Sequence, residues 1–337
     1  MSDKIRLLVT DGASGRFLSR VKANPASAPF EIIAPESAEE DALLALAPEA
    51  EAVLCYKAAL PASVIHAATK LRYIQKHGLN CKNIAVEAAR ERGVPVGTQS
   101  LMRNATVAEQ ALTLMLCCER KTIPGQKAVE AGVYREMGIE PVATSQWNIR
   151  PNWPEIEGVA ELFGKSAGII GLGDIGMDIA RRCAAFDMEI FYYQRTRHEP
   201  DVEAEYRATY LDFDDLLARV DYLVLVLPHT AESEGMIGAE QLARMKETAT
   251  LINVGRGALV DEAALARALE QGEIAMAGLD VYQYEPLPYD SPLIGLPNAV
   301  LLPHTGGGSN RQWDVDIPAS LGKIAAFFGG DDGGGKS

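Results

Sequence analysis

The segment SAGIIGLGDIG, residues 166 to 176, is the part of this chain that says most about its fold. It predicts a buried strand, a tight turn and a helix N-terminus, with glycines spaced as Gly-x-Gly-x-x-Gly. In this arrangement Gly171 permits the turn, Gly173 lets the backbone approach a pyrophosphate, and Gly176 lets the helix pack closely on the strand. Asp174 and Ile175 lie between the last two glycines, where free backbone amides of the helix attract phosphate. The stretch therefore predicts a dinucleotide site, the alternative being a glycine-rich turn without a ligand.

Short β-rich runs alternate with helical stretches on both sides of this motif, which is typical of parallel sheets with crossover helices. Helices are expected over residues 39–46 and 85–92, and a long connecting helix over 104–121. The segment 137–159 shows neither the helical nor the strand spacing of apolar residues, so we expect it to be a loop or lid. The expected strands are residues 5–10, 30–34, 52–55, 73–77, 95–97, 166–171, 189–193, 222–227, 250–254, 275–279 and 300–302.

The bulk composition narrows the class of protein. The 337 residues suffice for two domains, and 32 Lys and Arg against 46 Asp and Glu give a net charge of −14. Nucleic acids and anionic membranes are approached through Lys and Arg, so neither is an expected partner. No apolar run is long enough for a membrane span, no signal peptide is visible, and the five cysteines lack Cys-x-x-Cys spacing. We interpret the chain as a cytoplasmic protein with reduced thiols and no metal site.

The residues after the next expected strand bear on cofactor choice. That strand ends at Gln194, 18 residues beyond Gly176, where an NAD-selective site places Asp or Glu to bind the ribose hydroxyls. Here the chain continues Gln194, Arg195, Thr196, Arg197. With no carboxylate to repel a 2′-phosphate and two guanidiniums nearby, we expect NADP(H) to be preferred and NAD to be possible. The alternative is a pair of solvated loop arginines.

Three later motifs each place one ionisable residue just past an apolar strand. They are LINVGRG (251–257), GLDVYQYEP (278–286) and LLPHTGG (301–307), and they contribute Arg256, Glu285 and His304. Open α/β sheets bind ligands at the carboxyl ends of their strands, so we expect these side chains in one region. An arginine can donate two parallel hydrogen bonds to a carboxylate, and a histidine exchanges protons near neutral pH. A hydrogen bond from His304 to Glu285 would fix the imidazole tautomer and stabilise the imidazolium.

With the glycine motif and these three motifs in this order, the chain resembles the D-isomer-specific 2-hydroxyacid dehydrogenase family, in the manner of glyoxylate/hydroxypyruvate reductases. The resemblance implies an oxidoreductase that transfers a hydride between NAD(P)H and a small 2-keto acid or D-2-hydroxy acid. It implies an α/β fold of two doubly wound parallel-sheet domains. A Rossmann cofactor domain, residues 104–302, would be inserted into a flavodoxin-like substrate domain, residues 1–103 and 303–337. A homodimer is also implied.

The resemblance carries roles onto matched positions. Arg256 would anchor the substrate carboxylate and polarise its carbonyl, His304 would exchange the proton, and Glu285 would support His304. Asp280 is implied to contact the nicotinamide carboxamide and Val107 to pack near the nicotinamide. The residues implied to line the adenine and nicotinamide pockets are Leu227, Pro228 and Val254.

Residues 76–84, KHGLNCKNI, resemble the family's substrate loop, whose backbone amides bind the carboxylate of the 2-keto acid. Gly78, Leu79 and Asn80 are therefore implied to bind substrate, together with Arg256 and His304. The family's usual loop has glycine where Asn80 stands and an acidic residue at position 82. Because Asn tolerates left-handed backbone geometry, we expect the loop shape to survive. The alternative is that the side chains of Leu79 and Asn80 narrow the pocket.

Two other functions stay open. A cofactor-sensing scaffold, like related corepressors, would need none of the three catalytic residues, so their presence together disfavours it. A dehydrogenase of the same fold could instead act on phosphite or formate. Formate enzymes of this fold carry Gln rather than Glu before the histidine, so Glu285 disfavours formate.

Overall fold

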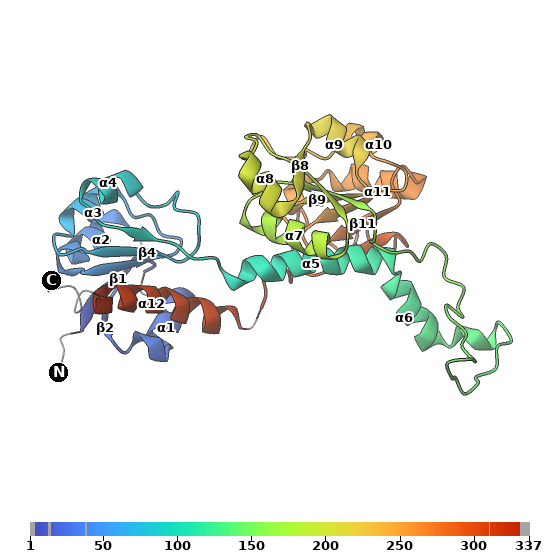
Figure 1. Ribbon diagram of the computed structural model, residues 1–337, viewed down its shortest axis with the longest axis horizontal. Coiled ribbons are helices and arrows are strands. Elements are labelled where there is room, and N and C mark those ends of the chain that lie inside the picture. The colour runs from blue at the N-terminus through green and yellow to red at the C-terminus, as the bar shows by residue number, and fades with distance from the viewer. Residues whose placement is uncertain (1–3, 13–14, 38, 310, 331–337) are drawn as a thin grey trace. The chain divides into compact units, whose positions relative to one another are not determined.

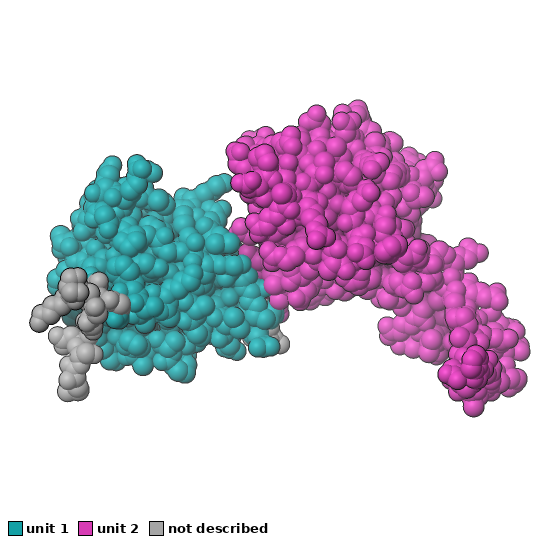
Figure 2. Space-filling model, in the orientation of Figure 1, with its two compact units in different colours: residues 1–103, 309–337 teal, residues 104–308 magenta. Residues whose placement is uncertain are grey.

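The computed structural model describes residues 4–12, 15–37, 39–309 and 311–330. The chain divides into two compact units, Met1–Arg103 with Ser309–Ser337 (unit 1) and Asn104–Gly308 (unit 2), drawn in two colours in Figure 2. The second division falls after Gly308 rather than after residue 302. The reason is that Thr305 and Gly306 donate backbone hydrogen bonds to Asp280, which lies in unit 2.

Unit 1 contains a five-stranded parallel sheet in the order β2-β1-β3-β4-β5. Helices cover both faces: side chains of α2, α3 and α4 pack in one apolar cluster, and those of α1 and α12 pack in another. This is the flavodoxin-like doubly wound order. The strands are β1 Ile5–Val9, β2 Phe30–Ile33, β3 Ala52–Cys55, β4 Tyr73–Lys76 and β5 Val96–Gly97, and the helices are α1 Arg16–Ala23, α2 Glu40–Leu46, α3 Ala62–Ala67, α4 Val86–Glu91 and α12 Gln312–Gly330.

Unit 2 contains a seven-stranded parallel sheet in the order β12-β11-β10-β9-β6-β7-β8, which is the Rossmann order with one added strand. Figure 1 labels the strands β8, β9 and β11 of this sheet. Side chains of α5 and α7 pack in one apolar cluster, and those of α9, α10 and α11 pack in a second. The strands are β6 Ser166–Ile170, β7 Glu189–Tyr193, β8 Ala208–Tyr210, β9 Tyr222–Leu225, β10 Thr250–Asn253, β11 Met276–Leu279 and β12 Ala299–Leu301. The helices are α5 Met102–Glu119, α6 Thr122–Ala131, α7 Asp174–Ala185, α8 Pro200–Tyr206, α9 Phe213–Arg219, α10 Ala239–Arg244 and α11 Glu262–Gln271.

The predicted fold class, two doubly wound parallel sheets, is confirmed. The central strands β6, β9, β10 and β11 are buried along their whole length, as expected for strands covered on both faces. One strand escaped prediction: β8 has three residues, too few for an alternating pattern. The long helix α5 spans 102–119, and the chain leaves the helix at Lys121, whose φ of 50° is left-handed.

After α5 the chain forms α6 and a short 3-10 helix, Val133–Arg135, neither with a buried residue. The expected loop over 137–159 consists of turns and one isolated bridge between Ser145 and Asn148. Across the ranges that the structure describes, none of the helices combines the length and apolar character that crossing a bilayer requires.

Candidate active site

The glycine turn has the geometry that its sequence predicts. Gly171 has φ of +99°, and a Cβ on Gly176 would lie 2.2 Å from the Gly171 carbonyl oxygen, so the turn and α7 pack too closely for a side chain. Among the described residues, nothing lies within 4 Å of a Cβ added to Gly173, the N-cap of α7. Burial, and then the Asp178 carboxylate, raise the pKa of Asp174, while Ile175 packs against the core. The turn therefore leaves open space beside its free amides, as a bound pyrophosphate requires.

A cavity of about 520 Å³ opens beside this turn, over the carboxyl ends of β6, β7 and β9. Of the predicted cofactor residues, six line it: Gly171, Gly173, Gln194, Arg195, Leu227 and Pro228. Val254 is buried in the apolar core and Val107 packs against that core, so neither lines this cavity. The cavity also has Glu232 in its wall, an acidic residue that the sequence motifs did not single out.

The two arginines after β7 are separated by the structure. Arg195 lines the cavity, whereas Arg197 does not. Both oxygens of the Glu203 carboxylate accept hydrogen bonds from Arg197, each at 2.8 Å, and the guanidinium lies 5.6 Å from the Tyr210 ring centroid. The charge of Arg197 is thus already paired within the chain.

His198, which belongs to none of the predicted motifs, contacts the glycine turn. Its Nε2 lies 2.7 Å from the carbonyl oxygen of Leu172, so Nε2 is the donor. The backbone N–H of His198 in turn donates to the Tyr192 hydroxyl at 3.0 Å. This residue holds the turn between Gly171 and Gly173, a role that no local sequence pattern could indicate.

The turn that carries Arg256 is held by the last residue of β10. The Asn253 side chain donates to the Arg256 carbonyl oxygen at 3.0 Å and accepts from the Gly255 N–H at 3.0 Å. A Cβ on Gly257 would lie 1.8 Å from the Tyr282 carbonyl carbon, so this turn packs directly against the backbone that follows β11. The Arg256 side chain itself is exposed.

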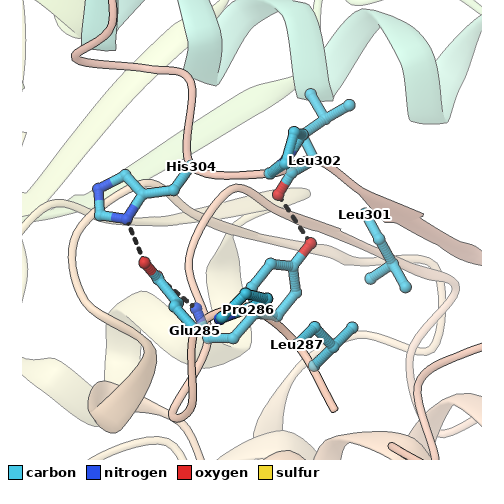
Figure 3. Close-up of a pocket in the computed structure, with 8 residues that line it drawn as sticks. Glu285, Pro286, Leu287, Leu301, Leu302 and His304 are labelled. Atoms are coloured by element: carbon cyan, nitrogen blue, oxygen red, sulfur yellow. Dashed lines mark hydrogen bonds and ion pairs between the residues drawn. The ribbon is translucent and has the colours of Figure 1, made fainter. Parts of the chain in front are cut away.

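Glu285 and His304 form the predicted pair. His304 Nδ1 donates to Glu285 Oε2 at 2.6 Å, and the other carboxylate oxygen accepts from the Tyr282 N–H at 3.1 Å (Figure 3). Burial raises the pKa of Glu285. The hydrogen bonds from His304 and Tyr282 and the Arg256 charge together lower it by more than burial raises it, so the net shift is downward. The carboxylate is therefore ionised near neutrality, and because Nδ1 is the donor, Nε2 is left to exchange a proton.

The pair borders a cavity of about 480 Å³ whose other walls are largely apolar, with Pro286, Leu287 and Leu301 among them (Figure 3). The turn that carries Arg256 packs on Tyr282, whose N–H donates to Glu285, so the predicted Arg, Glu and His segments lie in one region of unit 2. Within the described residues, no group of three or more His, Cys, Asp or Glu could hold a metal ion.

Asp280 has its partners within the chain. One of its oxygens accepts from the Thr305 N–H at 3.0 Å and from Gln110 Nε2 at 2.7 Å, and the other accepts from the Gly306 N–H at 2.8 Å. The side chain is 2% exposed. Asp280 thus fixes the turn that follows His304, and its expected contact with a nicotinamide carboxamide stays a prediction.

The loop expected to bind substrate lies in unit 1. Gly78 has φ of +127° and Leu79 is exposed. Asn80 is not among the described residues with positive φ, so it does not use the left-handed geometry that asparagine tolerates. Its side-chain oxygen instead accepts from the Lys82 N–H at 2.9 Å, a local turn that asparagine forms readily. Beneath the loop, the buried Lys76 ammonium donates to Asn83 Oδ1 at 2.9 Å and to the Tyr56 carbonyl.

Comparison with known proteins agrees with this geometry. The D-isomer specific 2-hydroxyacid dehydrogenase NAD binding domain matches residues 112–306. The chain is 39% identical to the glyoxylate reductase of Pyrococcus horikoshii over 83% of this chain and 78% of that one. It is 38% identical to glyoxylate/hydroxypyruvate reductase B of Pectobacterium atrosepticum over 78% of each chain.

Among solved structures, the NADPH-dependent glyoxylate/hydroxypyruvate reductase of Sinorhizobium meliloti superposes with a TM-score of 0.63 at 28% identity, over 96% of this chain and 94% of that one. The matched region holds the glycine turn, the cavity beside it and the Arg256, Glu285 and His304 segments. The chain belongs to the D-isomer-specific 2-hydroxyacid dehydrogenase family of oxidoreductases.

Proposed function

We propose that this enzyme reduces glyoxylate, hydroxypyruvate or a similarly small 2-keto acid to the D-2-hydroxy acid, with NADPH as the preferred cofactor. The observation that carries the proposal is the 2.6 Å contact of His304 Nδ1 with Glu285 within reach of the Arg256 charge. The names of the matched relatives, glyoxylate reductase and glyoxylate/hydroxypyruvate reductase, support the substrate class.

Each side chain has a defined part in such a reduction. Arg256 pairs with the substrate carboxylate and draws charge from the carbonyl oxygen. His304 Nε2 donates a proton to the oxygen as negative charge develops there, and Glu285 stabilises the imidazolium before that transfer. The bound nicotinamide supplies the hydride to the carbonyl carbon. In unit 1, the backbone amides of residues 78–80 are proposed as a further anchor for the carboxylate.

The glycine turn fits the pyrophosphate of the cofactor, because space is open beside Gly173 and the α7 N-terminus. We assign unit 2 to the cofactor and unit 1 to the substrate. NADPH preference rests on Arg195, which lines the adjoining cavity with no Asp or Glu at position 194. Glu232, in the same wall, would repel a 2′-phosphate. The NADPH preference therefore requires that the 2′-phosphate bind nearer to the Arg195 guanidinium than to the Glu232 carboxylate.

The direct test is a turnover screen. Oxidation of NADPH and of NADH would be followed with glyoxylate, hydroxypyruvate, pyruvate and longer 2-keto acids. We expect turnover with the small acids and higher kcat/KM with NADPH. Binding of NADPH without turnover of any 2-keto acid would overturn the proposal in favour of a cofactor sensor.

The cofactor proposal has a matched pair of variants. Arg195→Ala is expected to raise the KM for NADPH about tenfold and that for NADH less than twofold, since one charge-assisted contact is lost. Arg197→Ala is the control, because Glu203 already neutralises that guanidinium. Equal effects of the two variants on NADPH, or equal effects of Arg195→Ala on both cofactors, would contradict the role given to Arg195.

We also propose a cytoplasmic homodimer that forms through α6 and the segment after it. This region keeps large apolar side chains in contact with solvent: Val129 is 61%, Val142 60%, Trp147 88% and Ile149 67% exposed. Exposed apolar groups gathered in one segment are typical of a protein interface. Light scattering should give twice the mass of one chain, and Val129→Glu with Ile149→Glu should give a monomer. A wild-type monomer at assay concentrations would refute the dimer.

A further inference from the structure

Tyr282, in the segment that carries Glu285, also contacts the segments that carry Arg256 and His304. The backbone of Tyr282 packs against Gly257, the neighbour of Arg256. Its N–H donates to Glu285 Oε1 at 3.1 Å. Its hydroxyl donates to the Leu302 carbonyl oxygen at 2.8 Å, two residues before His304, and the Leu279 carbonyl oxygen lies farther from it, at 3.3 Å. The proposed reaction uses none of these atoms, so their convergence needs its own explanation.

The bond to Leu302 acts on the backbone of His304. The same Leu302 carbonyl oxygen also accepts the backbone N–H of His304 at 3.1 Å, closing a tight turn. Within that turn His304 has φ of 54°, a left-handed conformation that costs energy for a residue with a side chain. The surrounding structure must therefore stabilise the turn. The Tyr282 hydroxyl does so by donating to the Leu302 carbonyl oxygen, the same atom that accepts the His304 N–H.

The hydroxyl is a dependable donor. Tyr282 is 8% exposed, and burial, followed by the Asp280 carboxylate, raises its pKa to about 12. The hydroxyl thus stays protonated throughout the range in which a histidine exchanges protons. A hydroxyl proton that is shielded from water loses little of its bond to solvent competition.

We propose that Tyr282 is a positioning residue for the His304–Glu285 pair. Its amide orients the carboxylate and its hydroxyl orients the histidine turn, so a single residue sets the distance between the two. This inference rests on the proposed function in one respect, that the pair carries proton transfer. The contrary reading is a core tyrosine whose hydroxyl merely satisfies a buried carbonyl.

Tyr282→Phe removes the hydroxyl and keeps the backbone bond to Glu285. The matched control is Tyr222→Phe. Tyr222 is another buried tyrosine of unit 2, at the amino end of β9, and its hydroxyl donates to the Glu119 carboxylate. We expect Tyr282→Phe to lower kcat about tenfold, as a partly misplaced general acid would, with the KM for NADPH within twofold. Tyr222→Phe should change neither, although both variants lose a buried hydrogen bond and are expected to melt earlier than the wild type.

The pH profile separates positioning from packing. A looser contact with His304 removes part of what lowers the pKa of Glu285, so the acid limb of kcat/KM should move to higher pH in Tyr282→Phe. The limb should stay in place in Tyr222→Phe. Wild-type kcat and an unmoved acid limb in Tyr282→Phe, or the same losses in both variants, would overturn the inference.

A spectroscopic measurement keeps the inference testable if the substrate is misassigned. The Nδ1 proton between His304 and Glu285 should give a low-field resonance in NMR spectra of the whole protein, identified by its loss in His304→Asn. Tyr282→Phe should shift or broaden that resonance, and Tyr222→Phe should leave it alone. A wild-type protein without 2-keto acid turnover that still shows this pattern would refute the proposed function and support the positioning role. An unchanged resonance in Tyr282→Phe would refute the positioning role.

Discussion

Two histidines follow parallel strands at the carboxyl ends of their sheets, and their surroundings differ in every respect. His304, after β12 in unit 2, has a side chain 45% exposed and a carboxylate partner at 2.6 Å. His77, after β4 in unit 1, is 2% exposed and has a hydroxyl partner, Ser320, at 2.8 Å. Burial first, and then the Arg103 and Lys76 charges, lower the pKa of His77 to about 4.

The difference shows that place in the fold does not make a histidine a catalyst. His77 stacks on Trp313 with an interplanar angle of 8° and lies 4.9 Å from the Phe17 ring centroid and 5.1 Å from that of Tyr56. It is a neutral member of an aromatic cluster. His304 has the two conditions that proton exchange needs, an anionic neighbour that stabilises the charged ring and access for a substrate. The partner and the access decide the role.

The contrast between His304 and His77 is tested most directly by making the same substitution at both positions. Asparagine retains an N–H near the Nδ1 position of histidine and lacks Nε2. His304→Asn should therefore keep a bond to Glu285 but lower kcat about 10²- to 10⁴-fold, the usual contribution of a general acid. His77→Asn should keep a bond to Ser320 and lower kcat less than threefold. Steady-state assays with NADPH in excess would measure both, and comparable losses in kcat would remove the distinction.

The second prediction concerns stability against pH. The pKa of His77 is about 4 when folded and near 6.5 when unfolded, so between these values the unfolded chain binds more protons. The stability that neutral His77 contributes is complete above pH 6.5 and is lost as pH falls toward 4, by about 3 kcal/mol in all.

Urea denaturation at a series of pH values would measure this loss as the difference between wild type and His77→Asn. We expect the variant to be less stable at pH 7 and the two curves to converge toward pH 4. Parallel curves across that range would show that His77 titrates alike in the folded and unfolded states.

Some of this could be predicted from sequence and some could not, for physical reasons. Gly171 and Gly176 meet backbone requirements that only glycine meets, so the turn could be placed from its spacing. The pairing of Arg197 with Glu203 depends on how the chain enters α8, which no local pattern encodes. The local turn at Asn80, in which its side chain accepts the Lys82 N–H, could not be told in advance from the left-handed geometry that asparagine also tolerates.

Long-range contacts were the least predictable. The role of Tyr282 depends on Leu302, twenty residues further along, meeting its hydroxyl in the folded sheet. The placement of Arg256, Glu285 and His304 was predictable because each of them follows a strand of one sheet. Their supports, Asn253, Asp280 and Tyr282, satisfy backbone groups and carry no chemical pattern of their own.

The last prediction exchanges the partners rather than the histidines and has the smallest expected effect. Glu285→Gln keeps a hydrogen-bond acceptor for His304 Nδ1 but removes the negative charge, so the charged ring is less favoured and kcat for reduction should fall about tenfold or more at neutral pH. The acid limb of the pH profile should also be lost, because the amide of the variant does not titrate as the Glu285 carboxyl does. Ser320→Ala leaves the buried His77 Nδ1 without its partner and should lower the free energy of unfolding by about 1 to 2 kcal/mol, with kcat and its pH profile unchanged. If Glu285→Gln left the pH profile unmoved, the carboxylate would be a structural partner as Ser320 is, and the contrast between the two histidines would then rest on access to substrate alone.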